Sequence, residues 1–199
     1  MSPHNYRIED DPYCYSGTKV FRNFLNIKNP KTLEKQEYRL AAQAQLELLE
    51  DTTFRSGVIS FGLWKYIHKE IFKDIYPWAG EVRTVRLSKE NATFAYPENI
   101  EKEAMKVFQA LGQENNWQDK PTEYFINKLA HYYAELNAIH PFRDGNGRTQ
   151  KLLFSEIAHR ANHPIDWTKI DYKTHLEAVI ASFYGDTRPL EAAIAKAIT

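Results

Sequence analysis

The chain has 199 residues, of which 43% are hydrophobic and 14% aromatic, a composition that is typical of one folded domain with its own core. Its 26 Lys and Arg residues balance 26 Asp and Glu residues, which argues against bulk electrostatic attraction to nucleic acid or to an anionic membrane. Any phosphate that the protein binds must therefore be held by local charges.

The cysteine usage and the hydropathy of the chain indicate its cellular compartment. The single cysteine, Cys14, cannot form an intrachain disulfide, and its neighbours carry no group that would activate a thiol. The N-terminal residues are polar and acidic, and no run approaches the roughly 18 apolar residues of a membrane span. We therefore expect a soluble protein of the cytoplasm, with no membrane partner and no direct nucleic-acid partner.

Apolar residues recur at helical spacing through most of the chain, which predicts an all-α fold. Residues 1 to about 30 are rich in turn-forming types and are expected to wrap the domain. Thr122 is expected to cap one helix, and Pro97 and Gly112 to open and close another. Seven helices are predicted, over about 31–50, about 60–73, 97–112, about 122–136, about 147–161, 172–183 and the residues after Pro189.

Residues 81–96 are the exception to the helical pattern. Side chains alternate from Val82 to Leu87, turn-forming residues follow from Ser88 to Asn91, and a second extended segment runs from Thr93 to Tyr96. This arrangement predicts a β-hairpin. In a helical domain such a hairpin is either a flap over a site or a decoration, because two strands alone are only marginally stable.

The segment from His140 to Lys151, HPFRDGNGRTQK, lies between two strongly periodic helices. Its Asp-Gly-Asn-Gly run, residues 144–147, favours a turn with positive φ values, after which the helix resumes near Gly147 or Arg148. A glycine-rich turn that leads into a helix presents backbone N–H groups and the positive end of the helix dipole to an anion. Arg148 and Lys151 lie three residues apart on one face and would add a cationic wall.

The same segment suggests a nucleotide phosphate bound with a divalent cation. Asp144 supplies the hard oxygen ligand that Mg²⁺ prefers, and His140 could take a proton from an incoming hydroxyl. Pro141 is expected to hold His140 in an extended conformation, which ends the preceding helix. The alternative interpretation is a simple turn that joins two helices and carries a surface histidine.

The run HPFRDGNGR, from His140 to Arg148, resembles the signature of the Fic (filamentation induced by cAMP) family, His-x-Phe-x-Asp/Glu-Gly-Asn-Gly-Arg-x-x-Arg. The segments Tyr66 to Arg83 and Asp11 to Ile27 are also similar to parts of Fic toxins and secreted effectors. The resemblance implies a single Fic domain over residues 1–199, an all-α bundle with a β-hairpin flap over the active site.

The resemblance also implies a protein adenylyltransferase, which transfers AMP from ATP to a hydroxyl side chain of a target protein and releases pyrophosphate. His140 would deprotonate the hydroxyl, and Asp144 would hold Mg²⁺ between the α- and β-phosphates. The implied cofactor is Mg²⁺, with ATP as co-substrate. The Doc branch of the family has Ala-Asn-Lys where this chain has residues 145–147 and phosphorylates instead, so nucleotidyl transfer is favoured.

Five further residues would bind the phosphates by the same resemblance. Asn146 and the N–H groups of Gly145 and Gly147 would bind α- and β-phosphate oxygens, Arg148 the β-phosphate and Lys151 the γ-phosphate. Lys151 stands where the family motif has arginine, so its hold on a phosphate, or on the glutamate of an inhibitory helix, should be looser. Phe142, within the motif, is expected to be a buried anchor for the loop.

The hairpin would then be a flap that pairs with an extended segment of the target through main-chain hydrogen bonds. The alternative is a structural hairpin that only covers the core. The candidate target-binding residues of the flap are Arg83, Thr84, Val85, Arg86, Leu87, Thr93 and Phe94.

The resemblance suggests partners as well. Toxin members of the family modify type II topoisomerase subunits, and effector members modify host proteins such as small GTPases, so the site of action is the bacterial cytoplasm or a host cytoplasm. The inhibitory pattern Ser/Thr-x-x-x-Glu-Gly/Asn has no match here, because Thr187 to Glu191 has the spacing but contains Pro189 and is followed by Ala192. A separate small antitoxin that supplies an inhibitory glutamate is therefore a candidate partner, and an unregulated protein is the alternative.

Two other functions stay open at this point. The enzyme could transfer another phosphate-linked group, such as UMP, GMP, phosphocholine or phosphate, or the chain could be an inactive Fic-like module that binds peptides. The remaining histidines are expected to be structural. His159 and His163 lack the glutamate of a zinc-hydrolase motif, and three others, His68, His131 and His175, lie in amphipathic helices as packing or capping residues.

Overall fold

The computed structural model describes residues 11–89, 92–114, 117 and 120–199, and it confirms the helical fold. Each predicted helix is present within a few residues of its expected bounds. The helices are α1 (Pro30–Glu50), α2 (Thr52–Ser56), α3 (Phe61–Phe72), α4 (Ile100–Gln113), α5 (Thr122–Ile139), α6 (Asn146–Arg160), α7 (Tyr172–Phe183) and α8 (Arg188–Ala197), with 3₁₀ turns η1 (Pro97–Asn99) and η3 (Trp167–Lys169).

Several helix ends differ from the prediction. Thr122 is the first residue of α5 and Pro121 its N-cap, so Thr122 is not a cap. Pro97 opens the 3₁₀ turn η1, and Gly112 lies inside the last turn of α4. The five-residue helix α2 was not predicted, because it is too short to show a helical period; the Asp51 side chain caps it by accepting from the Phe54 N–H.

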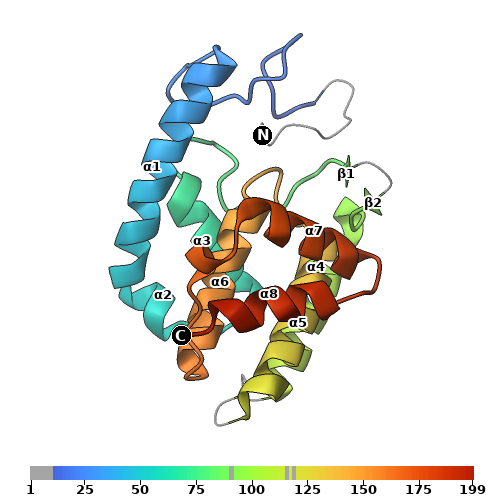
Figure 1. Ribbon diagram of the computed structural model, residues 1–199. Coiled ribbons are helices and arrows are strands. Elements are labelled where there is room, and N and C mark those ends of the chain that lie inside the picture. The colour runs from blue at the N-terminus through green and yellow to red at the C-terminus, as the bar shows by residue number, and fades with distance from the viewer. Residues whose placement is uncertain (1–10, 90–91, 115–116, 118–119) are drawn as a thin grey trace.

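The helices form one bundle around α5 and α6, which lie side by side in the middle of the molecule (Figure 1). The long helix α1 runs along one edge and packs against α3, while α7 and α8 pack on α5. The core is rich in aromatic residues, and Trp64, Phe125 and Phe154 are fully buried in it. The loop between α5 and α6 therefore belongs to the centre of the bundle.

The predicted hairpin is much shorter than expected. Strands β1 (Ser88–Lys89) and β2 (Ala92–Thr93) pair antiparallel, with Ser88 opposite Thr93 and Lys89 opposite Ala92. Beyond this ladder, Phe94 N–H donates to Leu87 C=O over 3.2 Å. Residues 82–87, predicted as a strand, are an irregular segment, and Asn91 of the predicted turn lies outside the described residues.

The contacts of Arg83 explain why residues 82–87 do not form the predicted strand. The side chain is 1% exposed, and its guanidinium donates to main-chain carbonyls on three sides, while its own N–H donates to Pro141 C=O over 2.9 Å. A helix leaves its last carbonyls without partners, and Arg83 supplies donors for them at the end of α5. The four acceptors are the carbonyls of His140 (2.7 Å), Val85 (2.7 Å), Ala95 (2.6 Å) and Ile139 (3.2 Å).

Residues 11–29 lie on the bundle and are tied to its centre, whereas residues 1–10, which belong to the same predicted segment, lie outside the described residues. Asp11 accepts from Arg143 Nε over 3.0 Å, and an isolated bridge joins Cys14 to Phe21. Burial, with the Asp11 charge, raises the pKa of the Cys14 thiol to about 11, which agrees with an unreactive cysteine. Among the residues that the structure describes, no helix is long and apolar enough to cross a membrane.

Replacement of Arg83 should destabilise the fold. Arg83→Met removes a buried cation and leaves main-chain carbonyls at the end of α5 without donors, so we expect the free energy of unfolding to fall by about 3 kcal/mol. Urea unfolding measures this change. Arg86→Met, an exposed position in the same segment, is the matched control, and an equal loss in both variants would contradict the role of Arg83.

Candidate active site

The loop between α5 and α6 begins with a reversal of the chain at His140. This residue has φ 49° and ψ 63°, and its N–H donates to Leu136 C=O over 3.2 Å. The prediction that Pro141 keeps His140 extended is therefore wrong. A proline disfavours the right-handed helical region in the residue before it, and a residue in the left-handed conformation is a common way to end a helix.

Phe142 and Asn146 close the loop. The Phe142 ring is fully buried, as expected, between the edge of Trp64 (ring centroids 5.4 Å apart) and the face of His68 (3.9 Å). The Asn146 amide accepts from Phe142 N–H over 2.9 Å and donates to Phe142 C=O over 2.8 Å. Both ends of this amide therefore serve to close the loop, and the main-chain N–H of Asn146, which has no acceptor among the described residues, is available to a phosphate.

The two glycines of the loop have different tasks. Gly145 has φ +79°, and a Cβ there would lie 2.4 Å from Phe72 Cε2, so no side chain fits. Gly147 is already helical and has open space where a Cβ would point. The helix resumes at Asn146, one residue earlier than predicted. Gly147 therefore leaves the first turn of α6 accessible to a ligand.

The N-terminus of α6 offers three backbone donors. The N–H groups of Asn146, Gly147 and Arg148 precede the first intrahelical bond, and within the described part of the chain none of them has an acceptor. The N–H of Gly145 donates to Asp144 Oδ1 over 2.5 Å, so it does not belong to this set. Three aligned donors and the helix dipole suit a phosphate.

Asp144 lies directly beside these donors. Its Oδ1 is 3.8 Å from Arg148 Nη2, and its side chain is about nine-tenths buried. No cluster of three metal-ligating side chains is found among the described residues. A single carboxylate next to a phosphate-binding helix end fits Mg²⁺, which is commonly held by one or two carboxylates together with substrate phosphates.

His68 fixes the loop between α5 and α6 through the main chain of Asp144, a role that the sequence did not suggest. Its Nδ1 accepts from Gly80 N–H over 2.8 Å, which places the ring proton on Nε2, and Nε2 donates to Asp144 C=O over 3.0 Å. Burial lowers the pKa of His68 to about 3, so the ring is neutral. The sequence predicts a packing histidine, and His68 is indeed buried. Its hydrogen-bond partners, Gly80 and Asp144, are distant in the sequence and could not be predicted from it.

His140 presents its imidazole at the other side of the loop. The ring is half-buried and stacks on Phe94, with centroids 4.0 Å apart, and Phe94 in turn packs on Phe183. His140 Nδ1 lies 3.3 Å from Asn137 C=O. In the tautomer that donates from Nδ1 to this carbonyl, Nε2 carries the lone pair.

The two basic side chains in the first two turns of α6, Arg148 and Lys151, have different neighbours. Arg148 Nη2 lies 2.6 Å from Glu37 Oε1 on α1, and its guanidinium lies 4.7 Å from the centroid of the Phe72 ring. Lys151 Nζ lies 5.6 Å from the centroid of the Trp167 ring, and burial lowers its pKa. Arg148 contacts α1 and α3 whereas Lys151 contacts η3, so the cationic wall expected from the spacing stays a prediction.

The residues of the predicted flap fall into two groups. The side chains of Arg83, Leu87 and Phe94 are buried, so they anchor the segment and do not face a partner. The side chains of Thr84, Arg86 and Thr93 are exposed and that of Val85 is half-buried.

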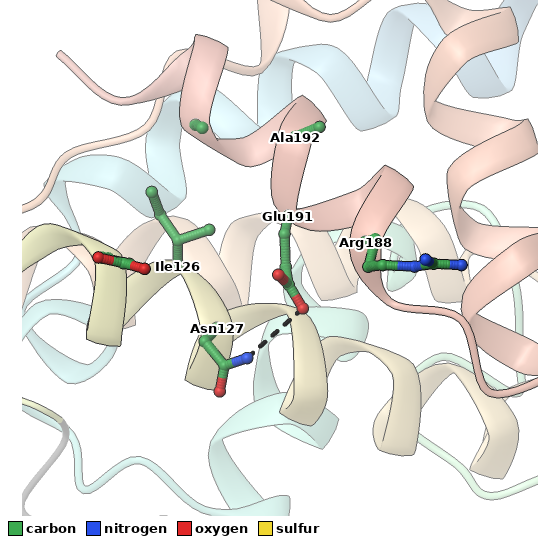
Figure 2. A pocket seen from close by; sticks show the side chains of 7 residues that line it. Ile126, Asn127, Arg188, Glu191 and Ala192 are labelled. Atoms are coloured by element: carbon green, nitrogen blue, oxygen red, sulfur yellow. Dashed lines mark hydrogen bonds between the residues drawn. The ribbon is translucent and has the colours of Figure 1, made fainter.

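Glu191, the near match to an inhibitory glutamate, is engaged elsewhere. It lines a groove of about 440 Å³ between α5 and α8, and Figure 2 shows its carboxylate turned towards Asn127. It accepts from Asn127 Nδ2 over 3.5 Å and from Thr187 Oγ1 over 2.7 Å. The carboxylate near Arg148 is Glu37 instead.

Two of the other histidines make structural contacts. His163 Nε2 lies 3.0 Å from Lys120 C=O and its ring stacks on Phe125, and His175 Nε2 lies 3.2 Å from the Tyr133 hydroxyl. His131 and His159 are exposed, so the packing role predicted for His131 is not confirmed.

The fold and this loop define the class of protein. The sequence model of the Fic/DOC family matches residues 59–158, a span that includes the whole segment between α5 and α6. The chain therefore belongs to the Fic/DOC family.

Individual relatives agree with this assignment. The probable protein adenylyltransferase y4lH of Sinorhizobium fredii is 37% identical over 97% of this chain and 98% of its own length. Protein adenylyltransferase VbhT of Bartonella schoenbuchensis is 36% identical over 98% of this chain, which spans 40% of VbhT. The crystal structure of BepC with bound AMPPNP from Bartonella tribocorum, 24% identical, has a TM-score of 0.83 and covers 94% of this chain, with 96% of its own chain covered.

Two histidines with lowered pKa values, the buried His68 and the half-buried His175, predict how stability depends on pH. Burial lowers the pKa of His68 to about 3, and burial with the Lys151 charge lowers that of His175 to about 4. Both values lie below the pKa of about 6.5 in the unfolded chain. The unfolded state therefore binds protons first as the pH falls, so the stabilisation is complete above about pH 6.5 and is lost progressively below it.

Urea unfolding between about pH 6 and about pH 5 should show a loss of up to about 2.7 kcal/mol per pH unit, the limit for two protons. His175→Gln should roughly halve this slope, whereas His131→Gln, an exposed position on α5, should leave it unchanged. A slope that His175→Gln does not alter would contradict the assignment.

Proposed function

We propose that this chain is a protein adenylyltransferase that transfers AMP from ATP to a hydroxyl side chain of a target protein and releases pyrophosphate. The observation that carries the proposal is the first turn of α6, where three N–H groups without acceptors in the described chain lie beside Asp144 and Arg148, at the end of the loop that begins with His140. The names of the relatives y4lH and VbhT and the AMPPNP bound to BepC support ATP as the co-substrate.

His140 acts on the attacking group. From the tautomer that donates Nδ1–H to Asn137 C=O, Nε2 takes the proton of the target hydroxyl as its oxygen bonds to the α-phosphorus and the bond to the pyrophosphate oxygen breaks. Stacking on Phe94 holds the ring in place. The proton stays on the imidazolium until solvent removes it.

The phosphates lie on α6. The N–H groups of Asn146 and Gly147 bind α- and β-phosphate oxygens, and Arg148 binds the β-phosphate. Asp144 holds Mg²⁺, which supplies charge neutralisation for the leaving pyrophosphate when it is bound. Lys151 reaches the γ-phosphate when it leaves the Trp167 ring, and as a single point charge it contributes less there than an arginine would.

The segment from residue 81 to residue 96 docks the target as a flap. The N–H groups of Arg83 and Thr84 already donate within the chain, to Pro141 C=O and to the Tyr13 hydroxyl. The N–H groups of Val85 and Arg86 have no acceptor among the described residues. Main-chain pairing with an extended target segment is therefore centred on these two residues.

The partner is a protein with an accessible hydroxyl, and type II topoisomerase subunits and host small GTPases are the candidate targets. BepC is described as a VirB-translocated effector, which supports delivery to a host cytoplasm as one site of action, the bacterial cytoplasm being the other. A small antitoxin chain that brings a glutamate to Arg148 or Lys151 would act as the inhibitor.

Labelled ATP tests the reaction directly. The wild-type protein, incubated with Mg²⁺ and a lysate, should attach label from the α-phosphate to proteins but none from the γ-phosphate, whereas label from the γ-phosphate alone would indicate phosphorylation. His140→Ala should lower the transfer rate by at least about 100-fold and change ADP affinity by less than about twofold, because the base does not bind phosphate. His131→Ala, on the exposed side of the same helix, should retain full transfer.

The metal site has its own test. Asp144→Asn keeps an acceptor for the Gly145 N–H but weakens the hard anionic ligand, so we expect the Mg²⁺ concentration for half-maximal transfer to rise by about tenfold. Asp74→Asn, an exposed carboxylate, serves as control. An unchanged Mg²⁺ requirement in Asp144→Asn would remove Asp144 from the metal shell.

A further inference from the structure

The charged cluster around Arg148 contains a carboxylate that the Fic signature does not include. Glu37 lies on α1, and its Oε1 is 2.6 Å from Arg148 Nη2. Its other oxygen, Oε2, accepts a hydrogen bond from the Tyr76 hydroxyl. Glu37 and Tyr76 are both buried, so the carboxylate is fixed at both oxygens and has little freedom to leave the arginine.

The guanidinium of Arg148 is held from several sides. Asp144 Oδ1 lies 3.8 Å from the same Nη2 that approaches Glu37, and the Phe72 ring lies 4.7 Å from the guanidinium carbon. A guanidinium is planar and carries five N–H donors in a fixed arrangement. A carboxylate at Nη2 and a ring on one face therefore fix the plane and still leave donors for a phosphate.

Glu37 neither strengthens nucleotide binding nor adds much to the stability of the fold. A negative charge beside a phosphate-binding arginine repels the phosphate and so weakens nucleotide binding. A buried ion pair also gains little net stability, because the loss of hydration of both charges offsets their attraction. What the arrangement does provide is a single orientation of the guanidinium before the nucleotide arrives.

We propose that Glu37 is a positioning residue for nucleotidyl transfer, which fixes the Arg148 guanidinium in the orientation that the transition state requires, with Tyr76 fixing Glu37. The inference rests on the proposed function, because it requires Arg148 to contact the nucleotide phosphates. An arginine that is already oriented stabilises charge on the leaving group without reorganisation. The contribution of Glu37 therefore falls on kcat and not on the KM for ATP.

Glu37→Gln tests whether Glu37 acts on kcat and not on the KM for ATP. The variant keeps the size of the side chain and an acceptor for the Tyr76 hydroxyl, but it loses the charge that holds Arg148. We expect kcat at saturating Mg-ATP to fall by about tenfold or more, while the KM for ATP and the Kd for ADP do not rise, because loss of the negative charge removes a repulsion of the phosphates. Glu34→Gln, an exposed glutamate on the same helix, is the matched control and should retain wild-type kinetics.

A second variant and a double-mutant cycle separate orientation from a general effect on the fold. Tyr76→Phe alters no charge and should also lower kcat, and an unchanged kcat there would overturn the proposal even if Glu37→Gln does not fold. In an Arg148→Lys background, which lacks a plane to orient, Glu37→Gln should cause no further loss. An equal loss in both backgrounds would show a merely structural role and overturn the proposal.

The remaining outcomes are equally decisive. An unchanged or increased kcat in Glu37→Gln would overturn the inference, the increase because Glu37 would then compete with the phosphate for Arg148. If the wild-type chain transfers no AMP, the proposed function fails and the inference fails with it. If the wild type and Glu34→Gln transfer AMP and Glu37→Gln does so at full kcat, only the inference fails.

Discussion

The closure of the α5–α6 loop by the Asn146 amide is the interaction on which the site depends. One side chain satisfies both the N–H and the C=O of Phe142, which lets the chain turn within six residues while the Phe142 ring enters the core. Without this closure two buried main-chain groups would be left without partners, at a cost of about 1–3 kcal/mol each, which is a large share of the stability of a typical domain. The position of Asp144, the left-handed Gly145 and the exposed first turn of α6 all follow from it.

Three buried charged contacts then connect this loop to distant segments. Arg83 fixes the flap segment to the end of α5, the Arg143–Asp11 pair fixes the N-terminal segment, and Arg148 meets Glu37 on α1. Buried charges of this kind contribute little net stability compared with apolar side chains. Their common effect is geometric, because each has directional partners and permits one arrangement of the elements that it joins.

The sequence predicts the helices and the turn between α5 and α6 well, because both depend on local signals. Helical periods mark α1 and α3–α8, and the glycine spacing marks the turn at residue 145. The prediction is weaker where a distant partner decides the structure: His140 adopts a left-handed conformation that serves the end of α5, and Arg83 draws its segment away from the hairpin. Glu37 has no signal at all in the sequence, since an acidic residue on α1 looks like any solvated charge until α6 is placed beside it.

The charges of the site explain how a chain with zero formal net charge could handle a polyphosphate. One cation, Arg148, lies between two carboxylates, Glu37 and Asp144, so these three side chains carry one net negative charge. The attraction for phosphates must then come from the N–H groups and dipole of α6 and, under the proposed function, from Lys151 and from the divalent cation that Asp144 holds. A site that receives much of its positive charge together with the nucleotide should bind polyanions weakly when that cation is absent.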